Sequence, residues 1–289
     1  MEMRIGMVFP QREIGDDPLL IRDYAQAAEG LGYSHLLVFD HVLGVGLGSR
    51  PDWRGPYDVD DAFHEPFVLF GYLAGLTTRI ELATGVIVLP QRQTALVAKQ
   101  AAQVDVLSGG RLRLGVGVGW NEAEYEALGE DFRNRGRRIE EQVALMRELW
   151  THRAVEFTGR WHRVPEAGLN PLPVQRPIPI WFGGHADAVV RRVAAMGDGW
   201  LPQMPPGPQA RNALDRLREY AASAGRDPAE IGVEARVGLQ QGERSRWREH
   251  VDGWRELGAT HLAVNMMDLG LHGADHIDAM ARLREELAG

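Results

Sequence analysis

Asp40 and His41 are the adjacent residues in this sequence best suited to acid–base chemistry. They end an apolar run, residues 35–41, that predicts a strand. A histidine ring gains and loses a proton near neutral pH, so it can act as a general acid or base. The neighbouring carboxylate could orient the ring. The pair therefore predicts proton transfer at this strand end, and a hydrogen-bonded structural pair is the alternative.

Two glycine features suit a flat ligand that carries a phosphate. Gly183 and Gly184 stand between a predicted strand and the start of a helix, where free backbone amides favour an anion. Gly85 interrupts a β-branched strand, as glycine does at a bulge or where a ligand approaches closely. The alternative for Gly183 and Gly184 is a plain tight turn. The alternative for Gly85 is a glycine needed for packing inside the barrel.

The elements that must position these residues are strands that alternate with amphipathic helices along the chain. Eight strand–helix units follow one another, which is the number that closes a parallel barrel. We therefore predict a single α/β domain over residues 1–289, a (β/α)8 TIM barrel whose strand C-terminal ends form the active site. The predicted strands are 4–10, 35–41, 80–89, 111–118, 178–182, 199–202, 231–239 and 261–265.

One segment, residues 155–176, breaks this alternation. It begins with VEFTGRWHRV, which predicts a short hairpin that turns at Thr158, Gly159 and Arg160, and a proline-rich stretch follows. We interpret the segment as an insertion before strand five. The polar loop 42–64 follows strand two, and we predict that it forms a lid over the barrel mouth.

The composition excludes several kinds of chemistry. The chain has no cysteine, which excludes disulfides, thiolate catalysis and cysteine-ligated zinc. Lys99 is the single lysine and falls in a helical segment, so Schiff-base chemistry inside the barrel is not expected. His272 and His276 lack an evident third ligand, so we expect an exposed pair and no metal site.

The charge and the apolar runs bear on partners and location. The formal net charge of −8 argues against binding to nucleic acid or to an anionic membrane. We find no signal-peptide pattern at the N-terminus and no apolar run long enough to cross a membrane. We therefore expect a cytoplasmic protein that acts on a small molecule. The arginine-rich run 133–138 is expected to be a solvated helix face or a partner for carboxylates.

Five segments of the sequence form an ordered set. They are FDHV (39–42), the block 65–129 with SGGRLRLGVGVGWN inside it, RGRRIEEQVALMRELW (135–150), PVQRPIPIWFGG (173–184) and GDGW (197–200). Taken in order, these segments resemble the luciferase-like monooxygenase superfamily, specifically its coenzyme F420-dependent oxidoreductase branch. The resemblance covers nearly the whole chain. It implies a TIM barrel with an insertion before strand five.

The resemblance also implies a site. The ring of the cofactor would lie over a bulge in strand three that carries a non-prolyl cis peptide, whose match here is Gly85-Val86. His41 would exchange the balancing proton, and Asp40 would orient it. The implied cofactor-binding residues are Thr84, Gly85, Val86, Gly117, Val118, Gly119, Trp120, Asn121, Phe182, Gly183, Gly184 and His185.

The leading hypothesis is thus an F420-dependent oxidoreductase that transfers a hydride between the deazaflavin ring and an unidentified small organic substrate. The alternatives are an FMN-dependent monooxygenase that a separate reductase supplies and a flavin-binding protein without turnover. Some relatives place a catalytic glutamate where this chain has Trp120, so sugar-phosphate oxidation is not expected. The resemblance also implies a homodimer. The apolar residues that could contribute to its interface are Phe67, Val68, Phe70, Leu96 and Val97.

Overall fold

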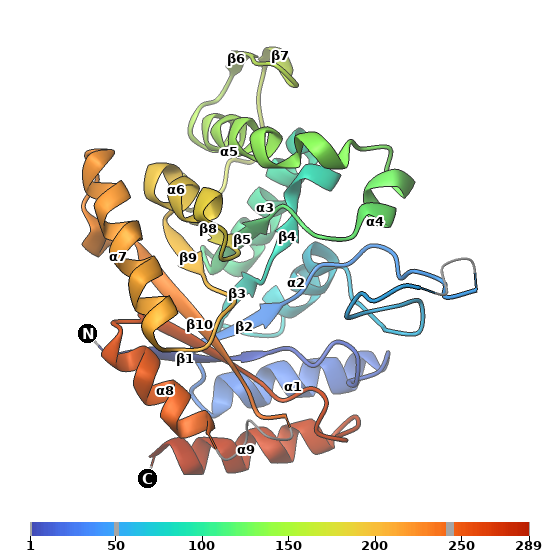
Figure 1. Cartoon of the computed structure of the whole chain (residues 1–289). Helices are drawn as coiled ribbons and strands as arrows, with labels where there is room; N and C mark the ends of the chain where they lie inside the picture. Colours follow the sequence, from blue (N-terminus) through green and yellow to red (C-terminus); the bar gives the residue numbers. More distant parts are fainter. Residues whose placement is uncertain (1, 49–51, 241–245, 289) are drawn as a thin grey trace.

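A closed ring of parallel strands surrounded by helices forms the protein in this computed structural model, which describes residues 2–48, 52–240 and 246–288 (Figure 1). The strands run in the order β3-β2-β1-β11-β10-β9-β8-β5-β4, and β3 also pairs with β5, which closes the ring. The predicted (β/α)8 barrel is confirmed. The barrel strands are β1 (Arg4–Val8), β2 (His35–Val38), β3 (Glu81–Thr84), β4 (Ile87–Val88), β5 (Leu112–Gly117), β8 (Ile180–Gly183), β9 (Gly199–Leu201), β10 (Gly232–Gly238) and β11 (His261–Asn265).

The helices begin where the sequence supplies N-terminal caps and prolines. Asp17 caps α1 and Glu65 caps α2, and each helix has proline as its first residue, where its missing amide hydrogen is not needed. No helix in the described ranges is both long and apolar enough to span a membrane. The helices are α1 (Pro18–Gly30), α2 (Pro66–Ala74), α3 (Thr94–Ser108), α4 (Glu122–Ala127), α5 (Arg135–Thr151), α6 (Asp187–Met196), α7 (Pro208–Ser223), α8 (Trp247–Glu256) and α9 (Asp275–Ala288).

Two features differ from the predicted elements. The strand predicted over 80–89 is two short strands, β3 and β4, and the non-prolyl cis peptide Gly85–Val86 separates them. The short helix α4 was not predicted, because its six residues are too few to show a helical period. The sequence also predicts an amphipathic helix over residues 244–257. The first two of these residues lie outside the described residues, and α8 begins at Trp247.

The insertion before strand five is the predicted hairpin, formed by β6 (Val155–Thr158) and the antiparallel β7 (Arg163–Ala167). Glu141 of α5 holds its turn. The carboxylate accepts hydrogen bonds of 2.8 Å from the backbone amides of Arg160, Trp161 and His162. The hairpin is therefore attached to the barrel through α5.

A network of buried charges fills the barrel at the N-terminal ends of its strands. His35 begins β2, and its Nε2 atom lies 2.7 Å from Oε1 of Glu234 in β10. Arg113 in β5 binds the carboxylates of both Glu234 and Glu81. His35, Arg113 and Glu234 are almost completely buried, so the charges of Arg113 and Glu234 depend on their partners. This network closes the barrel at the end opposite to the strand C-termini.

His272 and His276 do not form the exposed pair that was predicted. His276 is fully buried, and its Nε2 atom lies 3.0 Å from Oε2 of Glu13, whereas His272 is exposed. The contact between His276 and Glu13 connects α9 to the loop after β1, so we interpret His276 as a structural residue. Among the residues described, no group of three or more potential ligands is placed to hold a metal ion.

Candidate active site

A cavity of about 640 Å³ opens at the C-terminal ends of the strands, where a barrel is expected to carry its site. A volume of this size is typical of a pocket for a cofactor or a small ligand. The strand ends β2, β4, β5 and β8 supply most of its wall. The predicted site residues that line it are Asp40, His41, Gly85, Val86, Gly117, Val118, Gly119, Trp120, Gly183, Gly184 and His185.

Three predicted cofactor-binding residues lie behind this wall instead of in it. The Thr84 hydroxyl donates a hydrogen bond of 2.7 Å to the carbonyl of Gly115 in the neighbouring strand. Asn121 caps α4 by accepting a hydrogen bond from the amide of Ala123. Phe182 is buried in the core between the strands and the helices. These side chains support the wall of the cavity, and their contact with a cofactor stays a prediction.

The glycines of the wall make room for the bulge in the third strand. A Cβ atom at Gly117 would lie 2.5 Å from a methyl carbon of Val86, and one at Gly183 would lie 2.7 Å from the other methyl carbon. Gly85 itself packs against Leu37, so the packing interpretation of this glycine and the bulge interpretation both hold. Val86 can therefore project into the cavity between β5 and β8.

His41 lies in the wall of the cavity inside a group of aromatic rings. Its ring centroid is 4.7 Å from that of Phe63, 5.0 Å from that of Tyr57 and 5.7 Å from that of Trp120. The side chain is 11% exposed, and its Nε2 atom has no hydrogen-bond partner among the described residues. The aromatic rings restrict how the imidazole can turn, and the cavity gives a ligand access to it.

Asp40 does not orient His41, in contrast to the prediction. Its Oδ1 atom accepts a hydrogen bond of 2.7 Å from Arg92, and its Oδ2 atom accepts one of 2.9 Å from the amide of Val88. Asp40 is buried, and its carboxylate is held by Val88 of β4 and by Arg92, which follows the short 3-10 helix Leu89–Gln91. Asp40 fixes the rim of the cavity next to the histidine.

The carboxylate beside His41 is that of Glu124 in α4. Its Oε2 atom lies 3.4 Å from Nδ1 of His41, and its Oε1 atom accepts hydrogen bonds from the amides of Val42 and Leu43. Burial of the carboxyl group opposes its ionisation. The hydrogen bonds from His41 and from the two amides outweigh that effect and lower the pKa of Glu124. Glu124 is therefore a carboxylate at neutral pH.

A cationic corner lies at the other side of the cavity. Arg135 begins α5 and lines the cavity together with Gly183, Gly184 and Ala186, which precede α6. Within the described residues, no side chain caps the N-terminus of α6 and the buried Nε atom of Arg135 has no partner. Unpaired donors at a helix N-terminus favour an anion. Arg135 is thus an exception to the solvated face predicted for 133–138, whereas Arg138 pairs with Glu130 as expected.

The predicted lid contributes one side of the site. Pro56 and Tyr57 line the cavity, and Nε1 of Trp53 donates a hydrogen bond of 3.0 Å to the carbonyl of Tyr57. The rings of Trp53 and Trp120 lie 5.6 Å apart, which connects the loop to the end of β5. Residues 49–51 of this loop lie outside the described residues. The rest of the loop covers the aromatic side of the cavity.

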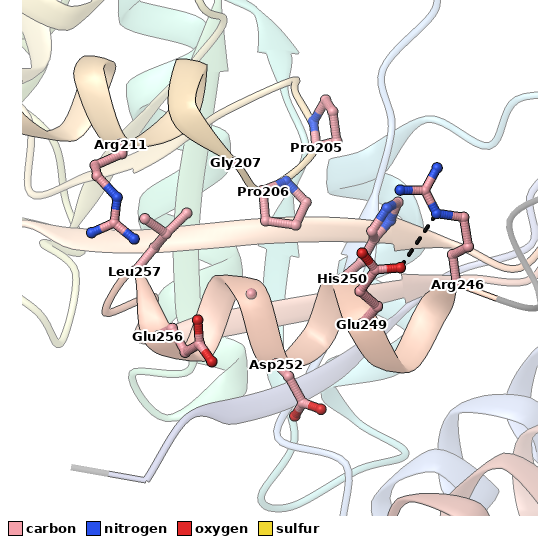
Figure 2. A pocket seen from close by; sticks show the side chains of 11 residues that line it. Pro205, Pro206, Gly207, Arg211, Arg246, Glu249, His250, Asp252, Glu256 and Leu257 are labelled. Atoms are coloured by element: carbon pink, nitrogen blue, oxygen red, sulfur yellow. Dashed lines mark hydrogen bonds and ion pairs between the residues drawn. The ribbon is translucent and has the colours of Figure 1, made fainter.

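Two further hollows adjoin or flank this cavity. One of about 590 Å³ shares Phe39, Tyr57 and Arg236 with it and extends over the ends of β10 and β11. The other, of about 660 Å³, lies between α8 and the connection from β9 to α7 (Figure 2). Its exposed Arg246 and Glu249 pair with each other. The shared walls make the first hollow a continuation of the candidate site, whereas the second is a charged surface groove.

Comparison with known proteins identifies the family. The model of the luciferase-like monooxygenase family matches residues 3–288. The chain belongs to this family. As a luciferase-like monooxygenase family member, it is an oxidoreductase, and the resemblance read from the sequence is confirmed at this level.

Individual members of the family differ in how much they share with this chain. An uncharacterised protein of Mycobacterium tuberculosis is 38% identical, over 72% of this chain and 74% of its own. The F420-dependent glucose-6-phosphate dehydrogenase of Intrasporangium calvum is 30% identical, over 78% of this chain and 71% of its own. A monooxygenase from Streptomyces bottropensis, 20% identical, superposes over 99% of this chain and 98% of its own with a TM-score of 0.79, which shows the shared fold.

Sequence reasoning missed two residues of this luciferase-like site, Glu124 and Arg135. Glu124 belongs to the stretch NEAEYEALG, in which three glutamates look alike and suggest a solvated helix. Arg135 lies in an arginine-rich run with the same appearance. The signal that could have singled out Glu124 is Asn121, because an asparagine at this position predicts a helix start and the residue three positions later then faces back toward the strand end.

Proposed function

We propose that this chain is an F420-dependent oxidoreductase that transfers a hydride between the deazaflavin ring and a small organic alcohol or carbonyl compound. The observation that carries the proposal is the arrangement of the barrel-mouth cavity. It has His41, whose Nε2 atom has no partner among the described residues, on one side, and it has Arg135 and the N-terminus of α6 on the other. The similarity to a relative named for its dependence on F420 supports the choice of cofactor.

The residues present fit a cofactor that has a flat ring and a phosphate. Arg135, whose Nη1 atom donates to the Phe132 carbonyl, and the amides that begin α6 would hold the phosphate, since among the described residues no carboxylate pairs with Arg135 and no side chain caps α6. Arg135 would then supply the positive charge that a phosphate requires, which the single lysine of the chain, Lys99 in α3, does not supply. Val86 on the bulge and Trp120 would contact the ring, because both project into the same cavity from neighbouring strands. The hollow over β10 and β11 would leave room for the substrate.

When bound, the deazaflavin supplies a carbon, C5, that accepts or donates a hydride. In the oxidation of an alcohol, the carbon–hydrogen bond would break with both electrons leaving as hydride. The hydroxyl proton would pass to Nε2 of His41 as the carbonyl forms, and the reverse reaction would return it. The loop with Trp53 and Tyr57 would exclude water from the reacting groups. Trp120 in place of an acidic residue argues against a sugar phosphate as substrate.

The cofactor assignment is tested by parallel titrations of the purified protein with F420 and with FMN, monitored by tryptophan fluorescence. We expect F420 to bind at least about tenfold more tightly. Replacing Arg135 with alanine should weaken F420 binding by about 10- to 100-fold, because a charge-assisted contact to phosphate is lost. Arg133→Ala, a neighbouring arginine outside the cavity wall, is the control.

Two outcomes would contradict the proposed function, the first at the cofactor and the second at the reaction. Tighter binding of FMN, together with oxygen consumption when reduced FMN is supplied, would instead indicate a monooxygenase. Tight F420 binding without hydride transfer to any member of an alcohol and ketone panel would indicate a binding protein.

We further propose that the protein forms a homodimer through α2 and α3. Of the apolar residues predicted for this interface, Phe67, Phe70 and Val97 are buried in the core, while Val68 is 72% exposed and Leu96 is 53% exposed. Exposed apolar side chains on adjacent helices favour association. Val68→Asp is expected to convert the dimer into a monomer in light scattering, and Val174→Asp, an exposed valine elsewhere, is not. A monomeric mass for the unmodified protein would overturn the proposal.

A further inference from the structure

Glu124 connects three parts of the site that are distant in the sequence. It belongs to α4, its Oε2 atom faces the ring of His41 after β2, and its Oε1 atom holds the first two amides of loop 42–64 at 2.8 and 3.2 Å. The carboxylate is almost fully buried, at 1% exposure. A buried carboxylate with this set of donors is fixed in place, so it can fix the orientation of the imidazole in turn.

The chemistry of a carboxylate determines which nitrogen of His41 carries hydrogen. An ionised carboxylate only accepts hydrogen bonds, so the facing Nδ1 atom must be the donor. In the neutral ring, Nε2 then has the lone pair, and it is the atom without a protein partner in the described part of the chain. This is the state that can take a proton from a substrate hydroxyl in the cavity.

We propose that Glu124 is the positioning residue for His41, holding the imidazole in its Nδ1–H form with the Nε2 lone pair toward the substrate. The proposal rests on the proposed function, because it assigns His41 the proton transfer. Asp40 cannot take this role, since its carboxylate binds Arg92 and the amide of Val88. Gln91 supports Glu124 from the other side, with its amide nitrogen 3.4 Å from the same Oε2 atom.

Glu124→Gln separates the charge of this residue from its structural role. The glutamine carbonyl oxygen can still accept the amides of Val42 and Leu43, so the loop base is kept. The glutamine NH2 group would then face Nδ1 of His41 as a donor, which reverses the tautomer and places the hydrogen on Nε2. Glu122→Gln, an exposed glutamate two residues earlier, is the matched control.

The first measurement is the 15N spectrum of the histidine side chains, without cofactor or substrate, with the His41 signal assigned by its loss in His41→Gln. We expect the Nδ1–H form in the unmodified protein and in Glu122→Gln, and the Nε2–H form in Glu124→Gln. An Nε2–H form in the unmodified protein would overturn the proposal, whether or not any variant folds. This result does not depend on F420, so it distinguishes failure of the positioning role from failure of the proposed function.

The second measurement is turnover with F420 and the best alcohol of a panel that begins with 2-propanol. Glu124→Gln should lower kcat by about 10- to 100-fold, as loss of a partner that orients a reactive ligand does. KM and the affinity for F420 should change less than about threefold, because Glu124 does not line the cavity and would contact neither the substrate nor the cofactor. An unchanged kcat, or a loss confined to KM, would overturn the positioning role.

Discussion

Replacing His41 with glutamine is expected to lower kcat by about 100- to 10,000-fold, the usual contribution of a general acid or base. Glutamine can occupy much of the same space between Tyr57, Phe63 and Trp120, but it cannot take up a proton near neutral pH. The measurement is steady-state oxidation of an alcohol, followed by loss of the visible absorbance of oxidised F420. The dissociation constant for F420, measured separately by fluorescence, should change less than about threefold.

The control for this prediction is His152→Gln, an exposed histidine at the end of α5 that pairs with Glu148. It should leave kcat unchanged. A His41→Gln enzyme that retains kcat would contradict the assignment of proton transfer to this residue. A variant that loses F420 binding instead of kcat would indicate that His41 serves the cofactor and not the substrate.

The architecture could be predicted from the sequence because it depends on local patterns repeated eight times. Each apolar run followed by an amphipathic run specifies one strand and one helix, and β11 begins and ends at the predicted residues, His261 and Asn265. The third strand was the exception. Val86, Ile87 and Val88 look like continuous strand, and the break depends on contacts with Leu37 and with glycines of β5 and β8, which no local pattern contains. The cis peptide followed only from the family resemblance.

The site was predicted as a region but not as a set of contacts. Adjacent residues on an extended chain direct their side chains to opposite sides, so Asp40 and His41 cannot easily pair even though they are neighbours. Asp40 turns toward Arg92, and His41 turns toward Glu124. The same alternation places Phe182 in the core behind the strands while its neighbour Gly183 lines the cavity. Partners more than fifty positions apart are set by how the barrel closes.

Replacing Glu234 with alanine is expected to lower the free energy of unfolding by about 3 to 5 kcal/mol, the usual result of removing one partner from a buried ion pair. Arg113 and His35 would remain buried with their shared carboxylate gone, and Glu81 would be the one carboxylate of the described residues that still binds the guanidinium. The measurement is urea denaturation, with the midpoint and slope compared between proteins. Glu219→Ala, at an exposed position in α7, should change the stability by less than about 0.5 kcal/mol.

The pH dependence of this effect has a defined sign. Burial opposes ionisation of Glu234, but the charges of Arg113 and His35 outweigh it and hold the pKa of that carboxyl well below its usual 4.5. Below pH 4.5 the unfolded chain therefore binds a proton that the folded chain does not, and the stability contributed by Glu234 declines as the pH falls. The difference between the unmodified protein and Glu234→Ala should be largest above pH 4.5 and should narrow in acid. A constant difference would contradict the ion-pair explanation.

The two largest effects should also be separable, because they belong to opposite ends of the barrel. His35 begins β2 at the buried network, and His41 follows the end of the same strand at the cavity. Glu234→Ala should therefore shift the urea midpoint while the protein that stays folded keeps its kcat. His41→Gln should lower kcat and leave the urea midpoint unchanged. If Glu234→Ala lowered kcat as strongly as it lowers stability, the two ends of the barrel would be coupled, and the buried network would have to be counted as part of the active site.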